Sequence, residues 1–312
     1  MTSAQKNVTV MGIFALDLAF RTHKLPAWGE TVVGSSLATA PGGKGTNQAI
    51  AAARLGAETY FLSKIGADAF GHIAEAAYRE AGVRTEFLRR DPHAATGAAA
   101  ILLDDATGEN AIVVSPGASS ALTVAEIDAA HEAIAHSACF LTQCELPLTL
   151  VRHALGLARS LGVPTILNPA PAVAGAQSLL PLCDFVTPNE HEAQALTGLP
   201  VSTLAEAEAA ADALLAHGAR HAILTLGARG AFVKSATLKQ HIPAFDAGPV
   251  VDTTGAGDAF NAGLAAALAE GMGVIAAARF GCAVAGIAVT RPGTSPSMPR
   301  RHEVEALLAR HA

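Results

Sequence analysis

Buried-strand patterns alternate with helical patterns along almost the whole chain. Continuous apolar runs are typical of strands covered on both faces. They occur at 8–14, 59–65, 139–143, 165–168, 185–187, 222–226 and 231–234. Helical patterns occur at 49–55, 70–81, 124–135, 259–268, 274–289 and 303–310, with further helix starts at 148 and 189. This alternation predicts an α/β fold with a doubly wound, mostly parallel central sheet and helices on both faces, in one domain of residues 1–312.

Composition narrows the class of protein. Half of the 312 residues are apolar and only 15% are charged, so we expect an extensive interior. The net charge is −6 and the Lys and Arg residues are scattered, which argues against a nucleic-acid partner. The richest apolar stretch, 262–289, is interrupted by Glu270 and Arg279, so we expect no membrane span.

The N-terminus and the cysteines bear on the cellular compartment. MTSAQKNVTV has no basic start followed by an apolar signal core. Four cysteines form neither a close pair with metal-ligand spacing nor a disulfide pattern: Cys139, Cys144, Cys183 and Cys282. We therefore expect a cytoplasmic protein with reduced thiols.

The stretch DTTGAGDAFN, residues 252–261, brings a glycine turn to the start of a helix. Backbone N–H groups there lack partners and the helix dipole adds positive charge, so the turn suits a phosphate group. Asp258 either caps this helix or acts as the base in phosphoryl transfer, with Gly255 and Gly257 supplying N–H groups. An Asp with an ordinary pKa of about 4 is a weak base, which suffices for a loose transition state.

Two better-known glycine motifs do not fit. GAGDAF lacks the third glycine of the dinucleotide fingerprint, which disfavours a nicotinamide enzyme. GGKGT, residues 42–46, lacks the upstream Gly and the Ser or Thr after Lys that a Walker loop needs.

Two segments interrupt the strand–helix alternation. Residues 21–41 contain small and β-prone residues without a helical period, and TGAAAILLD and ENAIVVS flank a turn at 104–108. We expect a small β-sheet lid, formed by about 15–41 and 95–115, inserted in the domain. Such a lid would exclude water from a transferred phosphate, and its open face would invite pairing with a second subunit as a homodimer.

Several polar residues stand near predicted strand ends or glycine turns. Asp17 is either a turn residue or helix cap, or a ligand contact beyond the carboxyl end of a strand. In PGGKGTNQA, residues 41–49, Asn47 is placed to bond a hydroxyl, whereas Lys44 is either solvated or functional. Glu145 follows strand 139–143.

Asn189 and Glu192 have the spacing of a helix capping box. The functional alternative is that Glu192 holds, directly or through water, the hydrated Mg²⁺ that travels with ATP, because this ion prefers a carboxylate and waters.

Six motifs carry a family resemblance: GETVVG, PGGKGTNQA, NPAPA, TPNEHEAQALTG, TLGARG and DTTGAGDAFN. In this order and spacing they resemble the ribokinase-like family of the phosphofructokinase-B sugar kinase superfamily, over essentially the whole chain from Val8. The resemblance implies an ATP-dependent sugar kinase that phosphorylates the 5-hydroxyl of D-ribose. It also implies Mg²⁺ and an activating monovalent cation, usually K⁺.

The resemblance also implies roles for individual positions. Asp258 matches the catalytic base, and the anion hole matches Gly255, Ala256 and Gly257. Sugar-binding positions match Asp17, Gly43, Lys44, Asn47 and Glu145. Nucleotide contacts match Asn189, Thr225, Gly227, Gly230, Gly257 and Cys282, the last standing where a relative has His. Glu192 matches a position linked to Mg²⁺. The monovalent-cation positions match Asp252, Thr254, Ala288, Arg291, Gly293 and Ser297.

One departure keeps the sugar open. Ribokinase-like proteins commonly have Asn two residues before the first sugar-binding Asp, and here that position is Ala15. A lost hydrogen bond in a buried polar site can shift specificity substantially. The alternatives are therefore a kinase for deoxyribose, a ketohexose, a sugar acid or a nucleoside, and, from another class, a non-catalytic sugar-binding regulator.

Overall fold

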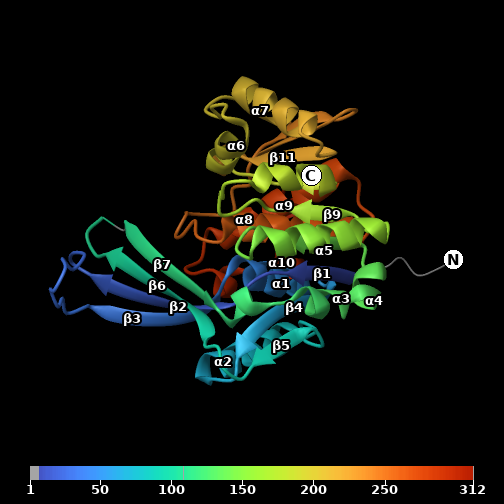
Figure 1. The fold of residues 1–312 in the computed structure, drawn as a ribbon. Helices are drawn as coiled ribbons and strands as arrows, with labels where there is room; N and C mark the ends of the chain where they lie inside the picture. The colour runs from blue at the N-terminus through green and yellow to red at the C-terminus, as the bar shows by residue number, and fades with distance from the viewer. Residues whose placement is uncertain (1–6, 108, 312) are drawn as a thin grey trace.

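The large sheet forms the centre of the molecule (Figure 1). The computed structural model describes residues 7–107 and 109–311, and within them the strand order is β13-β12-β11-β10-β9-β8-β1-β4-β5. The strands are β1 (Asn7–Met11), β4 (Glu58–Gly66), β5 (Leu88–Asp91), β8 (Cys139–Thr142), β9 (Thr165–Leu167), β10 (Phe185–Val186), β11 (His221–Thr225), β12 (Ala231–Ser235) and β13 (Lys239–Ile242). Within this described sheet, β12 is the one strand that runs in the direction opposite to all the others, so the predicted mostly parallel sheet is confirmed.

Helices cover both faces of this sheet, as predicted (Figure 1). One face packs against α1 (Lys44–Arg54), α2 (Ala69–Ala81), α8 (Ala256–Ala269), α9 (Val274–Ala288) and α10 (Arg301–Ala309). The other packs against α3 (Val124–Asp128), α4 (His131–Ala135), α5 (Leu148–Ser160), α6 (Glu190–Thr197) and α7 (Leu204–Ala216). Successive side chains of a strand point to opposite faces of the sheet: Val10 packs in the core on the α1 side and Met11 in the core on the α5 side.

A second, four-stranded sheet projects from the body in the order β3-β2-β6-β7 (Figure 1). Its strands are β2 (Ala15–Thr22), β3 (Ser36–Gly42), β6 (Thr96–Asp104) and β7 (Asn110–Gly117). The predicted small sheet is confirmed, with different strand bounds. The turn expected at 104–108 joins β6 to β7, and its last residue, Gly108, lies outside the described part.

The strand predicted at 8–14 ends early. The chain leaves the large sheet after Met11 and enters the small sheet at Ala15. Both strands are buried here, so an unbroken apolar run does not reveal the change of sheet. Asp17 therefore lies inside a strand, and its interpretation as a turn residue or helix cap is wrong.

Two other expectations need correction. The helix predicted at 124–135 is two short helices, α3 and α4. Ile127 and Ile134 are both fully buried and lie seven residues apart. The apolar spacing of a single helix therefore continues across the break between α3 and α4, and the sequence does not reveal that break. The elements α7, β5 and β13 were not predicted. The buried face of α7 is mostly alanine, which differs little in hydrophobicity from the rest of the helix, so the helical pattern is weak.

No helix within residues 7–107 and 109–311 combines the length and the hydropathy needed to cross a membrane.

Candidate active site

Polar residues gather where parallel strands end. Ligand sites in open α/β sheets form beyond the carboxyl ends of strands. The polar residues that end or follow β8, β9, β10 and β11 are Gln143, Glu145, Asn168, Thr187, Asn189 and Thr225. They face the starts of α1 and α8, which complete the site.

Helix α1 begins very close to the small sheet. Gly43 precedes it with φ of 88°, and a Cβ there would lie 2.7 Å from the carbonyl oxygen of Ile13. A Cβ on Gly42 would lie 2.3 Å from the carboxylate oxygens of Asp17. The first helical N–H group, that of Lys44, donates to Glu145 Oε2 at 2.9 Å. Glycine at both positions thus lets the helix start lie beside two carboxylates.

Asp258 lies in the first turn of α8, after Gly255 in the left-handed conformation with φ of 80°. Its side chain is 5% exposed. Asn47 Nδ2 donates to Oδ2 at 2.9 Å and Gln48 Nε2 donates to Oδ1 at 2.8 Å, both from α1. No side chain caps the start of α8, so the alternative that Asp258 caps its own helix is wrong.

The electrostatics of Asp258 differ from those of a surface Asp. Burial raises its pKa above the ordinary value, although the Lys44 ammonium and the hydrogen bonds from Asn47 and Gln48 oppose the rise. A raised pKa makes the carboxylate a stronger base than the ordinary Asp assumed from the sequence.

The neighbouring carboxylates are perturbed too. Burial raises the pKa of Glu145 to about 7 and that of Asp17 to about 6, and the Asp258 charge adds to both shifts. Burial by itself would lower the pKa of Lys44, but Asp258, Glu145 and Glu192 hold it above the usual value. Lys44 is therefore a charged group surrounded by carboxylates, which argues against the solvated alternative.

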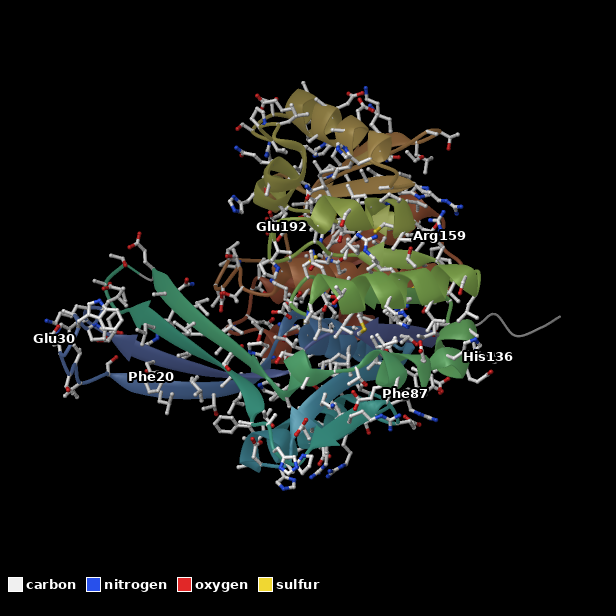
Figure 2. All side chains as sticks on the ribbon, viewed as in Figure 1. Phe20, Glu30, Phe87, His136, Arg159 and Glu192 are labelled. Atoms are coloured by element: carbon white, nitrogen blue, oxygen red, sulfur yellow. The ribbon has the colours of Figure 1, made fainter. Side chains whose placement is uncertain are left out.

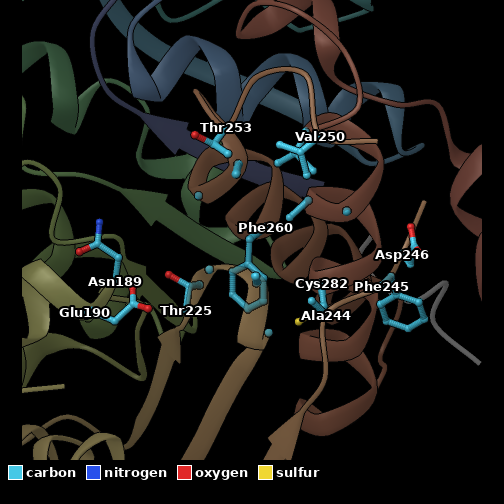
Figure 3. Close-up of a pocket in the computed structure, with 18 of the residues that line it drawn as sticks. Asn189, Glu190, Thr225, Ala244, Phe245, Asp246, Val250, Thr253, Phe260 and Cys282 are labelled. Atoms are coloured by element: carbon cyan, nitrogen blue, oxygen red, sulfur yellow. The ribbon is translucent and has the colours of Figure 1, made fainter. Parts of the chain in front are cut away.

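Two cavities adjoin these residues. A cavity of about 120 Å³ is lined by Lys44, Glu192, Asp258 and the turn Gly255–Ala256–Gly257. A larger one of about 570 Å³ lies beyond it. Figure 3 shows Asn189 and Glu190 on one side of the larger cavity and Phe245 and Cys282 on the other. The residues common to both linings are Asn189, Thr225, Thr253, Ala256 and Gly257.

The predicted nucleotide positions line the larger cavity. These are Asn189, Thr225, Gly227, Gly230, Gly257 and Cys282. The three predicted anion-hole residues line the smaller one, and the Ala256 N–H donates to the Thr253 carbonyl at 3.2 Å. A small polar cavity therefore opens into a large one, which suits phosphates attached to a bulkier group.

Glu192 forms the predicted capping box. Its Oε2 accepts from the Asn189 backbone N–H and its Oε1 from the Asn189 amide, each at 3.0 Å. The carboxylate is 8% exposed and lines the smaller cavity near the base of α6 (Figure 2). Within residues 7–107 and 109–311, no group of three or more His, Cys, Asp or Glu could hold a metal ion.

Hydrogen bonds connect some, but not all, of the six predicted monovalent-cation positions to one another. Asp252 Oδ1 accepts from the Thr254 N–H and Oδ2 from the Gly293 N–H, each at 2.9 Å. These bonds hold the pKa of Asp252 below its usual range, although burial acts in the other direction. Among the other three positions, the Ala288 carbonyl accepts from the Arg291 N–H, so these two are linked to each other. The Arg291 side chain pairs with Glu303, and Ser297 donates to the Thr294 carbonyl.

Some residues at the site were not predicted. Gln48 contacts Asp258, Ser295 Oγ donates to Asn47 Oδ1 at 2.7 Å, and Thr294 Oγ1 donates to Asp17 Oδ2 at 3.2 Å. Gln48 directly follows Asn47 in the same motif, which is the one signal that pointed to it. Ser295 and Thr294 come from a loop that the sequence did not connect to α1.

To catalyse phosphoryl transfer, a protein mainly has to position the reacting groups and stabilise the charge on the transferred phosphoryl group. A carboxylate beside a glycine-led helix start, open to a large cavity, meets this need, so the fold and site define a phosphotransferase. The model of the pfkB family of carbohydrate kinases matches residues 5–301, and the chain belongs to that family. Membership implies ATP as phosphoryl donor, an accompanying divalent metal ion and a small-molecule sugar as acceptor.

Individual relatives match almost the full length of the chain. A Bacillus subtilis protein named ribokinase is 41% identical over 97% of this chain and 100% of its own length. A Salmonella typhi protein named deoxyribokinase is 35% identical over 94% of this chain and 95% of its own. The solved structure of Arabidopsis thaliana ribokinase complexed with ribose and ATP superposes with a TM-score of 0.91, at 33% identity over 97% of this chain and 98% of that one.

Proposed function

We propose that this protein transfers the γ-phosphate of ATP to the 5-hydroxyl of D-ribose. The observation that carries the proposal is the position of Asp258, a buried carboxylate with a raised pKa. It stands between the predicted sugar residues and the cavity that opens toward the predicted nucleotide residues. The likeness to proteins named ribokinase, one of them solved with ribose and ATP, supports ribose as the sugar.

The residues at the site would have separate roles in binding the sugar, accepting the proton, stabilising charge and binding the nucleotide. Asp17, Asn47, Glu145 and the backbone at Gly43 would hold sugar hydroxyls. Asp258 would accept the proton of the reacting hydroxyl while that oxygen attacks the γ-phosphorus, whose bond to the β-phosphate oxygen breaks to release ADP. The turn Gly255–Ala256–Gly257 would stabilise charge on the transferred group, with Lys44 beside it. Asn189, Thr225, Gly227, Gly230 and Cys282 would hold the nucleotide.

We infer Mg²⁺ as the divalent metal, held by Glu192 through water. The fit lies in the donor set: one buried carboxylate on a polar cavity suits an ion that keeps several waters and arrives with phosphates. When bound, Mg²⁺ would supply positive charge that offsets the negative charge of the phosphates. Glu192 would orient that hydrated ion while its capping bonds hold the carboxylate in place.

We infer K⁺ as the monovalent activator, near Asp252. The Asp252 carboxylate supplies negative charge for a cation, and its bonds to the Thr254 and Gly293 N–H groups tie it to the loop beside the anion hole. Replacing K⁺ by tetramethylammonium should lower the rate. Asp252→Asn should abolish the response to K⁺, and an unchanged response would contradict the assignment.

A cytoplasmic location is part of the proposal. All four thiols, including that of Cys282 in the nucleotide cavity, are buried and unpaired in the described residues. Reduced thiols and a dependence on ATP suit that compartment.

The direct test is ADP release against a panel of pentoses, hexoses, sugar acids and nucleosides, with phosphate position assigned by ³¹P and ¹³C NMR. The expected result is the highest kcat/KM for D-ribose and a 5-phosphate product. A different best substrate would replace ribose while leaving the kinase class in place.

Deoxyribose is the second candidate, and Ala15 favours it. This residue is 1% exposed and lies two positions before Asp17, so both side chains point to the same face of β2. A methyl group there offers no hydrogen bond to a hydroxyl. The relative named deoxyribokinase adds support. Comparing kcat/KM for ribose and 2-deoxyribose, in the wild type and in Ala15→Asn, decides between the two sugars.

A further inference from the structure

The Asp258 carboxylate accepts a hydrogen bond from the side-chain amide of Gln48, which has no role in the function proposed above. Gln48 is fully buried on α1. Its Nε2 donates to Asp258 Oδ1 at 2.8 Å and to Asn168 Oδ1 at 3.2 Å. It lines neither of the two cavities. Any influence of Gln48 on a substrate must therefore pass through Asp258 or Asn168, which both line the smaller cavity, and the shorter bond goes to Asp258.

The orientation of this amide is determined by its neighbours. An ionised carboxylate only accepts hydrogen bonds, so the NH₂ group of Gln48 must face Asp258. Its Oε1 then faces Gln143, whose Nε2 donates to it at 2.6 Å. A flipped Gln48 would set its oxygen against the carboxylate and its NH₂ against the Gln143 NH₂.

The two amides that contact Gln48, those of Asn168 and Gln143, are also held in place. Asn168 Nδ2 donates to the Thr187 carbonyl at 3.3 Å, which turns its oxygen toward Gln48. Gln143 is 2% exposed, and its Oε1 has no hydrogen-bond partner in the part of the chain that the structure describes. A Cβ on Gly12 would lie 2.4 Å from that oxygen, so a glycine makes room for Gln143. The donors of Gln143 and Gln48 thus form a chain that ends on Asp258, while Asn168 turns its oxygen to Gln48 and its NH₂ group to Thr187.

We propose that Gln48 is a positioning residue for Asp258, with its amide orientation set by Gln143 and Asn168. It fixes the rotation of the carboxylate and supplies a hydrogen bond to the ionised form. A base must lie within hydrogen-bond reach of the proton that it takes, and a small displacement of a reacting group costs large factors in rate. The inference rests on the function proposed above, in which Asp258 is the base.

A purely structural role for Gln48 makes a different prediction. A buried amide that merely satisfies its neighbours would affect stability and leave the turnover of the folded enzyme alone. The two roles are separated by kcat, KM and the pH profile of the folded variants.

The test uses Gln48→Met and Gln143→Met in the full chain, with ribose and ATP. Methionine keeps much of the volume and removes the hydrogen bonds. For Gln48→Met we expect kcat to fall about 10- to 100-fold, with both KM values within about twofold of the wild type. The acid limb of the kcat profile should move upward by about one pH unit, because the ionised carboxylate has lost a donor. Gln143→Met should produce smaller changes in the same direction.

Thr46→Val is the matched control. Thr46 is also fully buried on α1, but its hydroxyl bonds to Tyr78 and to the Ile13 carbonyl rather than to Asp258. It should lower the melting temperature and leave kcat and the pH profile unchanged. Adding Gln48→Met to Asp258→Asn should cause little further loss, because the two residues act as a unit.

The results separate this inference from the proposed function. Normal kcat and an unshifted acid limb in folded Gln48→Met would overturn the positioning role. If Gln48→Met does not fold, an unchanged kcat and acid limb in Gln143→Met would overturn it equally. Full turnover in Asp258→Asn would instead remove the proposed base, whatever Gln48 does.

Discussion

At the scale of single residues, burial decides how the acidic groups behave. Asp258 is almost wholly removed from water, and its raised pKa makes it a better proton acceptor. The same burial costs stability, because an ionised carboxylate prefers water. Lys44, Asn47 and Gln48 offset part of that cost with one positive charge and two hydrogen bonds.

Asp258→Asn should lower kcat by about 10²- to 10⁴-fold, because the amide cannot accept the hydroxyl proton. Binding of ATP should stay within about twofold of the wild type, since its predicted contacts all line the larger cavity, which Asp258 does not line. Stopped-flow or coupled assays give kcat and calorimetry gives the ATP affinity. Turnover near that of the wild type would contradict the role of base.

Ribose binding should weaken in acid. Burial raises the pKa of Asp17 to about 6, so the carboxylate is ionised above that pH and protonated below it. A protonated Asp17 loses acceptor capacity for sugar hydroxyls. Protonation of Asp17 alone should raise the Kd for ribose, measured by calorimetry without ATP, about tenfold between pH 7 and pH 5.

Glu145, with its pKa raised to about 7, should begin to weaken binding at higher pH than Asp17 does. The two groups share a site, so the measured midpoints belong to the pair. Asp17→Asn is the control, and it should remove the lower of the two midpoints. A Kd that is flat from pH 8 to pH 5 would contradict the pKa assignment.

At the scale of elements, two helix starts converge on the site. Helices α1 and α8 both begin after a glycine with positive φ, Gly43 and Gly255, and α1 contributes both donors to Asp258 on α8. Helix α8 is in turn packed closely on α9: a Cβ on Gly263 would lie 2.9 Å from the Gly281 Cα and 2.8 Å from Val284 Cγ2. The position of the base therefore depends on this helix pair.

Gly263→Ala should destabilise the protein by about 1–3 kcal/mol, because the new methyl group overpacks the α8–α9 contact. Urea unfolding monitored by circular dichroism gives the free energy. The matched control is Gly156→Ala in α5, where a Cβ would meet nothing within 4 Å. There we expect a gain of up to about 1 kcal/mol from helix propensity. Equal effects at both sites would contradict the packing argument.

At the scale of the whole molecule, the small sheet stands apart from the body (Figure 1). It exposes apolar side chains, Phe20 among them (Figure 2). Phe20 is 38%, Leu37 55% and Val113 73% exposed. The strand register places these three on the face opposite to that of Asp17. An exposed apolar sheet face is typical of an interaction surface, and we propose that it pairs with a second copy of the chain.

Light scattering after gel filtration should give twice the chain mass of 31.5 kDa for the wild type. Val113→Glu should shift the protein toward the monomer, since a charge in the apolar interface is costly. Leu204→Glu is the control: Leu204 is 41% exposed on α7, away from the small sheet (Figure 1). A wild-type monomer, or a dimer insensitive to Val113→Glu, would contradict the pairing.

Much of the fold could be predicted because the elements obey local rules. Continuous apolar runs marked the buried parallel strands, and the glycine turns at Gly43 and Gly255 marked helix starts. The break between β1 and β2 could not be predicted, because the run from Val8 to Leu16 is buried throughout and periodicity does not say which sheet it joins. Helix α7 was missed because its buried face is mostly alanine.

The sequence by itself determined the chemical types at the site: the glycine turn, the acid that follows it, and the family to which their order belongs. Only the tertiary structure decided that Asp258 bonds to α1 instead of capping α8, and that Gln48, Ser295 and Thr294 lie at the site. Local backbone rules act over a few residues, whereas these contacts join residues more than 200 positions apart. Such contacts, and the loss of water that raises the pKa of Asp258, arise only when the chain packs.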